Sequence, residues 1–465
     1  MVHSGVRMRN CLHRHRRGMA AVIAMLFLAI FGTLAVGFYA AATTSVQVSS
    51  NEQRVLRASM AAESGMDFMR YQLARISIPY GVPQEWIFPL LYLQLQANMQ
   101  NTGNLSGRII WWGGTVIHVP ATYNRPIVLD AAQGSFRASI YNLGQKVRVK
   151  VTGTGPDGRT TRAVQLDYAL AQRASAIFDY GIASRGKVTT EGASRVRGAT
   201  DPTKGSILST CMSDPTPVVI KGKEVSGDIS VVNPNANVSI QNGASVGGTT
   251  NLQEIYASHV HKGVQEPEFP TVDTSAFAAY ATSVYTGGNT LVNCRIPANT
   301  NPTFAGNATI RGVLYVETPN RITFRGNVDI QGVIVVQNSP TGTIDSNVLD
   351  FSGSVSARGV ETLPESYGNL RKMTGSFILA PKFHVKFSGD FGTVNGSMLA
   401  DKFSMTGNAT GTVMGSVINL ADNAMTVSGS SEIIIASTGT TNYPAGVFFS
   451  SNFAPLSDTY EEVQP

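Results

Sequence analysis

An uninterrupted apolar segment from Met19 to Ala42 constrains this chain more than any other feature. It contains no charged residue, and only Thr33 and Tyr39 carry polar groups. As a helix it would be about 36 Å long, which is enough to cross a hydrocarbon core of about 30 Å with some tilt. A cleaved secretory signal is the alternative, but its apolar region normally runs only about 7 to 15 residues. We therefore expect a transmembrane helix, with lipid-facing side chains that include Met19, Ile23, Leu26, Phe27, Phe31 and Leu34.

The residues before this segment form a basic leader, 1–18, which contains no acidic residue. Its arginines are Arg7, Arg9, Arg14, Arg16 and Arg17. They account for most of the formal net charge of +6. A basic run directly before a membrane span follows the positive-inside rule, so it places the leader in the cytoplasm and argues against nucleic-acid binding.

The helix is predicted to continue beyond the membrane, over 19–78 in total. No proline occurs between Met1 and Ile78, and Gly65 stands alone in the polar half. Steps of three and four residues give one largely apolar stripe, and the other faces carry charged residues. The stripe is Val48, Glu52, Val55, Ser59, Ala62, Met66, Met69, Leu73 and Ile76. The second half of the helix should therefore pack against a domain.

The basic leader, Arg17-Gly18, the apolar helix and Ala61-Ala62-Glu63-Ser64-Gly65 together resemble the N-terminus of PilX-type minor pilins and GspK-type pseudopilins. The resemblance implies cleavage after Gly18 by a prepilin peptidase and methylation of Met19. It also implies assembly with other pilin-like subunits, at a bacterial inner membrane crossed once, with a periplasmic, extracellular or pilus-associated body. Most such proteins carry Glu at the fifth mature position, where this chain has Ile23. Tip-located members also lack that Glu, so the departure favours a tip or minor subunit and leaves open an uncleaved membrane anchor.

Residues 79–174 are expected to form a pilin-like antiparallel sheet domain. Pro79, Gly81 and Pro83 end the long helix, and a short second helix should follow. We expect its apolar side chains Trp86, Phe88, Leu91 and Leu93 to be core residues. Strand-like runs follow at 108–118, 136–141, 146–152 and 161–168, and the last three alternate apolar with polar residues.

Residues 175–436 contain a repeat that predicts a parallel β-helix, a solenoid of stacked coils. A Phe-x-Gly-Asn segment followed by Gly-Val recurs at an offset of about twenty residues. The repeated positions are Phe304, Gly306, Asn307 and Gly312, then Phe324, Gly326, Asn327 and Gly332. Such regular spacing disfavours a β-sandwich. Insertions are expected at 249–300 and 339–371, and 437–465 is expected to be a frayed tail. The fold class is thus mainly β behind a long N-terminal helix.

No catalytic, cofactor or metal site is predicted. Candidate acids for hydrolysis or lyase chemistry, namely Asp228, Asp329, Asp390 and Asp401, are scattered along the repeat. His259 and His261 could form half of a metal site, although a solvated loop is the better interpretation. Cys211 and Cys294 are the two cysteines that could pair, and free thiols are equally compatible with the sequence.

Three functions fit these features. The favoured one is a minor pilin or pseudopilin-like structural subunit of a type IV pilus or type II secretion-like system, which presents the solenoid for adhesion. The alternative is a membrane-anchored β-helix that binds or cleaves extracellular polysaccharide. A polymer-forming solenoid resembling bactofilins is disfavoured by the apolar helix and the sheet domain.

Overall fold

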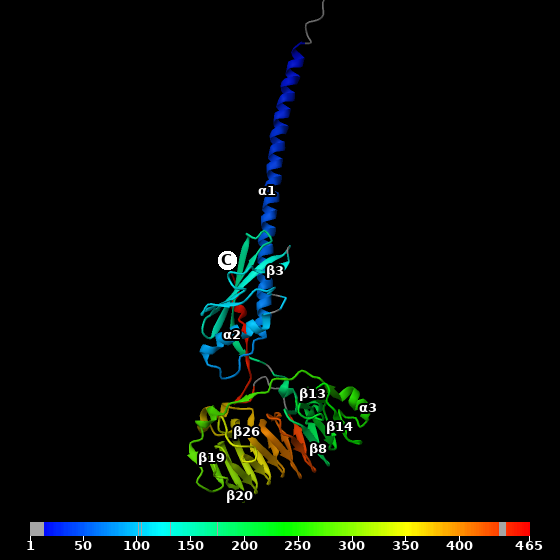
Figure 1. Cartoon of the computed structure of the whole chain (residues 1–465), viewed down its shortest axis with the longest axis vertical. Helices are drawn as coiled ribbons and strands as arrows, with labels where there is room; N and C mark the ends of the chain where they lie inside the picture. The colour runs from blue at the N-terminus through cyan, green and yellow to red at the C-terminus, as the bar shows by residue number, and fades with distance from the viewer. Residues whose placement is uncertain (1–13, 101, 104, 131, 174, 437–442) are drawn as a thin grey trace, which may run out of the picture. The chain divides into compact units, whose positions relative to one another are not determined.

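The computed structural model describes residues 14–100, 102–103, 105–130, 132–173, 175–436 and 443–465, with side chains from Met19 onward. Most of the leader, including Arg7, Arg9 and Cys11, lies outside the described residues. The chain divides into two compact units: unit 1 is Met1–Ala171 with Ser451–Pro465, and unit 2 is Gln172–Ser450. Figure 1 shows unit 1 as a helix on a sheet and unit 2 as a stack of strands.

Helix α1 (Arg14–Ala74) is a single continuous element of 61 residues. It begins earlier than the expected start at residue 19 and ends before Ile78, because the chain turns at Arg75–Ile76 and Ile78 bridges to Ser451. The second helix is α2 (Gln84–Met99). Its residues Phe88 and Leu91 are buried, whereas Trp86 and Leu93 are exposed, contrary to our expectation. Helical spacing explains the difference, because 88, 91, 95 and 99 share one face and 86 and 93 do not.

Unit 1 contains an eight-stranded sheet in which α1 covers one face. Its strands are β1 (Trp111–Trp112), β2 (Val116–Val119), β3 (Ile127–Asp130), β4 (Gly134–Asn142), β5 (Lys146–Thr154), β6 (Thr161–Gln172), β34 (Ser451–Pro455) and β35 (Glu461–Val463). The expected alternation is present: on β4 and β5 every second side chain is buried under the helix.

Of the expected tail, 437–465, residues 437–442 lie outside the described residues, and 443–465 are not frayed as we expected. Strand β35 pairs antiparallel with β6, and β34 lies at the β6 edge of the same sheet. Thr459 Oγ1 accepts a hydrogen bond from the Asp167 amide, 2.9 Å away. Ser451–Pro465 therefore completes unit 1, and the acidic composition that suggested fraying reflects only its solvent-facing side chains.

Unit 2 is built almost entirely from parallel strands, here called the parallel stack. The first group is β7 (Ile182–Ser184), β8 (Val188–Glu191), β9 (Arg195–Gly198), β10 (Ile207–Ser209), β11 (Val218–Lys221), β12 (Glu224–Val225), β13 (Ile229–Val231), β14 (Val238–Ile240), β15 (Ser245–Val246) and β16 (Val260–Lys262). The middle group is β17 (Thr271–Val272), β18 (Ser283–Val284), β19 (Thr290–Ile296), β20 (Thr303–Phe304), β21 (Ala308–Val316), β22 (Arg321–Phe324), β23 (Val328–Val336), β24 (Val348–Phe351) and β25 (Val355–Arg358). The last group is β26 (Ser376–Phe387), β27 (Gly392–Val394), β28 (Ser397–Met405), β29 (Thr410–Val413), β30 (Val417–Asn419), β31 (Met425–Val427), β32 (Glu432–Ile435) and β33 (Val447–Phe448). Short helices α3 (Leu252–Glu254) and α4 (Ser275–Ala278) interrupt them.

The two predicted repeat units lie side by side in register. Strand β21 pairs with β23 from Ala308↔Val328 to Val316↔Val336, and Phe304 pairs with Phe324. Gly312 and Gly332 have positive φ and lie one above the other, where a Cβ on Gly332 would come within 1.9 Å of the Gly312 carbonyl oxygen. The chain can turn a corner at this close approach only because both residues lack a side chain.

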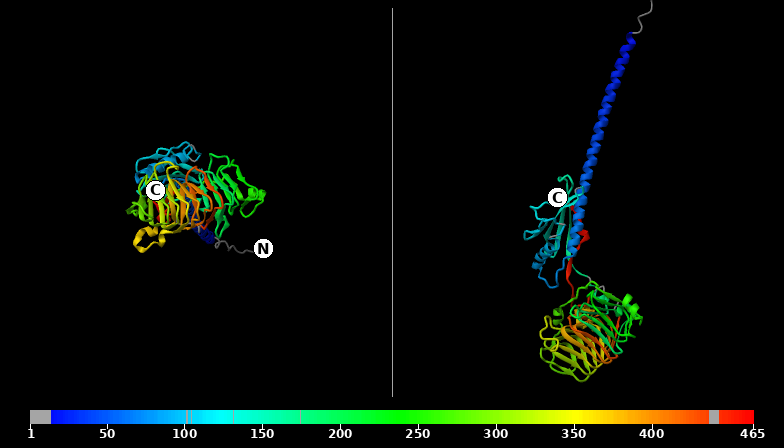
Figure 2. Two further views of the ribbon diagram at one scale, coloured as in Figure 1. Left: turned by 90° about the horizontal axis from the view of Figure 1, so that it is seen from below. Right: turned by 45° about the vertical axis from the view of Figure 1, so that its right-hand side comes forward.

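The order of the stack differs from the order of the chain. Strand β7 pairs with β10 on one side and with β30 on the other, so the last strands of unit 2 close onto the first ones. The segment after β16 therefore carries the chain from one end of the stack to the other, where β18 and β19 begin the second series (Figures 1 and 2).

Both expected insertions contain strands of the stack, which corrects our prediction. Segment 249–300 includes β16, β18 and β19, and segment 339–371 includes β24 and β25. In the second case the residues before β24 form an inserted loop, yet Phe351 still pairs with Phe324. The loops between paired strands differ in length, so these strands do not recur at a fixed offset of about twenty residues. The repeat could not be recognised here for that reason.

The parallel stack has an apolar core on the inside and a second apolar layer on one outer face. Inside, four phenylalanine rings lie face to face, with centroids 4.8, 5.0 and 4.9 Å apart, from Phe304 through Phe324 and Phe351 to Phe387. Outside, Val313, Val333 and Leu379 are covered by side chains from surrounding loops. Burial on both faces explains the continuous apolar runs in these strands.

Candidate functional site

The apolar half of α1 is the most unusual surface on the described chain. Its side chains have half or more of their surface exposed, including Met19, Ile23, Leu26, Phe27, Phe31 and Leu34. The helix is long and apolar enough to cross a membrane, and none of its most apolar window is buried. So large an apolar surface needs a covering of lipid or protein.

The threonine hydroxyls in this half and directly after it are satisfied within the helix. The Thr33 hydroxyl donates to the Ile30 carbonyl at 2.9 Å, and the Thr44 hydroxyl donates to the Ala40 carbonyl at 2.8 Å. Thr43 makes the same kind of bond to Tyr39 and Ala40. These three threonines therefore present no free hydroxyl donor, which suits a low-dielectric surrounding.

The expected processing position lies inside the helical backbone. Gly18 and Met19 belong to α1, shortly after its first residue Arg14. Ile23, four residues after Met19, has an exposed side chain.

The polar half of α1 docks on the sheet through small residues. A Cβ on Gly153 of β5 would lie 2.2 Å from the Ala58 carbonyl oxygen and 2.3 Å from the Ala62 amide nitrogen. A Cβ on Gly65 would lie 2.6 Å from the ring of Phe136 and 2.7 Å from Val151. The backbones of helix and strand thus touch, so the Ala61–Gly65 motif is explained by close packing on the sheet.

Sequence reasoning did not find Gly153 or Phe136 as the partners of this motif. The available signal was a glycine inside the otherwise alternating run of β5, since such a glycine often marks the close approach of another backbone. A second missed contact joins α1 to the C-terminal segment, where the Tyr460 hydroxyl donates to Glu63. Burial and this hydrogen bond raise the pKa of Tyr460 to about 12.

The parallel stack carries the repeat residues at two kinds of position. Phe304 and Phe324 are in its core, while Gly306 and Gly326 stack at a corner. The Asn327 amide nitrogen donates to Asn307 Oδ1 at 3.2 Å, and the Ser354 amide donates to Asn327 Oδ1 at 3.3 Å. The asparagines therefore hold neighbouring repeat units together by accepting hydrogen bonds from backbone amides.

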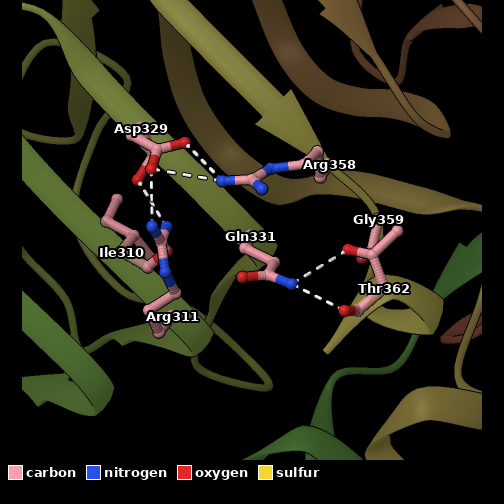
Figure 3. A network of polar contacts seen from close by, with 7 residues as sticks. All are labelled: Ile310, Arg311, Asp329, Gln331, Arg358, Gly359 and Thr362. Atoms are coloured by element: carbon pink, nitrogen blue, oxygen red, sulfur yellow. Dashed lines mark hydrogen bonds and ion pairs between the residues drawn. The ribbon is translucent and has the colours of Figure 1, made fainter. Parts of the chain in front are cut away.

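Asp329 lies in a polar network on the outside of the stack (Figure 3). Its carboxylate is 2.5 Å from Arg311 and 3.1 Å from Arg358, while Gln331 donates to the Thr362 carbonyl oxygen at 2.7 Å. Burial acts to raise the pKa of Asp329, but the hydrogen bonds from both arginines outweigh it and lower that pKa. An acid held ionised between two cations is poorly suited to donate a proton.

The other candidate acids do not gather around Asp329. Asp228 bonds to His259 at 2.7 Å and to His261 at 3.1 Å, and Asp390 accepts from the Gly392 amide. Burial is the main cause that raises the pKa of Asp401, on β28. Within the described residues no group of three or more His, Cys, Asp or Glu side chains is placed to hold a metal ion. His259 and His261 share the single carboxylate of Asp228. Cys211 and Cys294 are buried free thiols.

No protein-family model matches the sequence, and a search of curated proteins returns no match. Among solved structures, the competence-associated pilin ComZ from Thermus thermophilus is similar at 13% identity, with 88% of this chain and 97% of that chain covered. The TM-score of that match is 0.27, and at that value the likeness supports no inference about this chain.

Proposed function

We propose that this chain is a pilin-like structural subunit of the bacterial envelope, of the minor-pilin or pseudopilin kind. The observation that carries the proposal is the two-part helix α1. Its apolar half is fully uncovered, and its small-residue half is locked on an antiparallel sheet. A helix built in this way can rest in a bilayer and later exchange lipid for neighbouring helices without rearranging its domain.

The partners in this proposal are the inner membrane first and other pilin-like subunits second. Apolar side chains on all sides of the helix suit both environments, because lipid tails and packed helices are similarly apolar. Ile23 removes the carboxylate that would neutralise a neighbouring N-terminal amine. That amine would be costly to bury unpaired, so we assign the chain to a tip or minor position rather than to repeated copies.

We further propose that the parallel stack is a β-solenoid displayed outside the cytoplasm as a rigid adhesive or presenting body. Its in-register pairing and double-sided burial support a stiff module. We assign it no catalytic role and no cofactor. The arginine-paired Asp329 and the dispersed positions of the other acids support that assignment.

N-terminal mass analysis of the protein from its native membrane tests the proposal. We expect a mature chain that begins at methylated Met19, and loss of cleavage in Gly18→Leu. Gly32→Ala is the matched control, because a Cβ at Gly32 meets nothing within 4 Å. A membrane-bound chain that retains Met1 would favour the anchored polysaccharide-binding or -cleaving alternative, and a start after Ala42 would remove the membrane helix altogether.

A further inference from the structure

Unit 1 has a polar pocket on the sheet face opposite to α1. The pocket measures about 260 Å³, and the residues around it include His118, Thr122, Arg137, Ser139, Lys150 and Thr152. Three of these lie in one row across neighbouring strands, because His118 pairs with Ser139 and Ser139 pairs with Lys150. The His118 imidazole Nδ1 and the Ser139 hydroxyl are 3.0 Å apart.

The pocket carries positive charge that the described residues do not neutralise. Arg137 donates to the carbonyl oxygens of Ala121 and Asn124, and Lys150 donates to the carbonyl oxygen of Gln464 at 2.7 Å. Within the described part of the chain, neither cation forms an ion pair with a carboxylate, and no carboxylate lines the pocket. Burial, and then Arg108, lower the pKa of Arg137, so this guanidinium is partly desolvated without a counter-charge.

An aromatic ring extends the row beyond the residues that line the pocket. Trp111 pairs with His118 across β1 and β2, and the two rings stack with centroids 5.5 Å apart at an angle of 15°. Trp111 is 43% exposed, and it covers His118 on the side away from Ser139. Among the described residues, the site thus combines two cations that have no carboxylate partner with four hydroxyl groups, from Thr122, Ser139, Tyr141 and Thr152.

We infer that this pocket binds the carboxylate of an acidic sugar carried on a surface polysaccharide. Arg137 and Lys150 would pair with the carboxylate, and the hydroxyl side chains would match the sugar hydroxyls. Free phosphate could use the cations alone, but it would leave most of the hydroxyl side chains unused. The inference relies on the proposed position outside the cytoplasm for access to the polymer and does not depend on helix assembly.

Calorimetric titration of the full chain in a non-ionic detergent tests the pocket. Short oligogalacturonates are the probe, and neutral galactose oligomers and inorganic phosphate are the comparison ligands. We expect Lys150→Gln to weaken oligogalacturonate binding about tenfold, since a charge-assisted hydrogen bond is lost while the amide can still donate to Gln464. Lys146→Gln is the matched control. Lys146 lies on the same strand and face, outside the pocket lining, and its loss should change the affinity less than about twofold.

A second readout separates binding from structural damage. Burial, and then Arg137, lower the pKa of His118, and a bound carboxylate should raise it again. The nuclear magnetic resonance signals of the His118 ring should therefore titrate at higher pH with oligogalacturonate present, and this change should be smaller in Lys150→Gln.

Several results would overturn the inference: no binding, equal binding of neutral oligomers, or an equal effect of the Lys146 and Lys150 variants. Phosphate binding as tightly as the sugar acid would reject the sugar in favour of a bare oxyanion. Loss of Met19 processing with intact sugar binding would reject the assembly proposal and leave the pocket standing.

Discussion

The two sheets of this chain are stabilised in opposite ways. In unit 1 the antiparallel sheet is covered by one helix, and the fit depends on single contacts such as Gly153 against Ala58. In the parallel stack the same contact is repeated from strand to strand, as in the row Phe304, Phe324, Phe351 and Phe387. A contact that occurs once cannot be replaced by another, whereas a repeated contact can be lost at one strand while the others remain. The destabilising effect of a single substitution should therefore extend through unit 1 but stay local in unit 2.

Gly153→Val should have the largest effect. Its side chain would occupy the space of the Ala58 carbonyl and the Ala62 amide, so α1 must move off the sheet. We expect a loss of more than about 4 kcal/mol, or failure of unit 1 to fold. Hydrogen exchange read separately for each unit should show loss of protection in β4 and β5 and little change in β21 and β23.

Gly103→Ala is the control within unit 1, because a Cβ at Gly103 meets nothing within 4 Å. Native protection of β5 in Gly153→Val would show that the helix is not locked on the sheet. The two-part description of α1 would then be wrong.

Phe351→Ala tests the repeated contact. The ring of Phe351 stacks on Phe324 and Phe387, and it is fully buried. Truncation should cost about 3 to 5 kcal/mol through the cavity that it leaves. Protection of backbone amides against hydrogen exchange should fall in β22, β24 and β26, while β10 and β13 should keep their protection. Uniform loss of protection throughout the stack would show that unit 2 unfolds as one cooperative body.

The sequence predicted those features that depend on neighbouring residues. Length and polarity indicated the helix, alternation indicated β4, β5 and β6, and the Phe-x-Gly-Asn repeat indicated the pairing of β21 with β23. Each of these patterns is periodic within one segment, so it can be read without knowledge of the rest of the fold.

Contacts between distant segments could not be predicted in this way. Val417 pairs with Ile182, and Tyr460 bonds to Glu63, but no local period links either pair. The pocket cations Arg137 and Lys150 come from different strands, and they meet only through the register of β4 and β5. Pairing between distant strands of a stack or sheet is set by how loops return the chain, which a single sequence does not encode as a local pattern.

Acid should destabilise unit 2 through His384. Burial, then Lys402 and Lys386, lower the pKa of this imidazole to about 4. The unfolded chain, with an imidazole pKa near 6.5, binds the proton more readily, so the stabilisation is complete above about pH 6.5 and is lost as pH falls to about 4. The free energy of unfolding can be measured with denaturant across this pH window. It should change by up to about 3 kcal/mol less in His384→Gln than in the chain that keeps His384. His118→Gln replaces a histidine of unit 1 in the same way and is the matched control for His384→Gln. An unchanged pH profile in His384→Gln would mean that another group causes the acid sensitivity.

The smallest expected effect concerns the seam where the last strands of unit 2 meet the first. Glu432 on β32 lies 3.8 Å from Arg195 and 3.3 Å from Arg197 on β9, and both arginines also pair with Glu224 on β12. Glu432→Gln should lower the free energy of unfolding by about 1 kcal/mol. This decrease should be smaller at high salt, because these side chains are partly exposed. Glu191→Gln, in an exposed pair with Lys221, should cost close to nothing. An equal decrease in stability in both variants would mean that the charges at the seam do not favour the pairing of the last strands with the first. In that case apolar pairs such as Val417 with Ile182 must hold the two series together without electrostatic help.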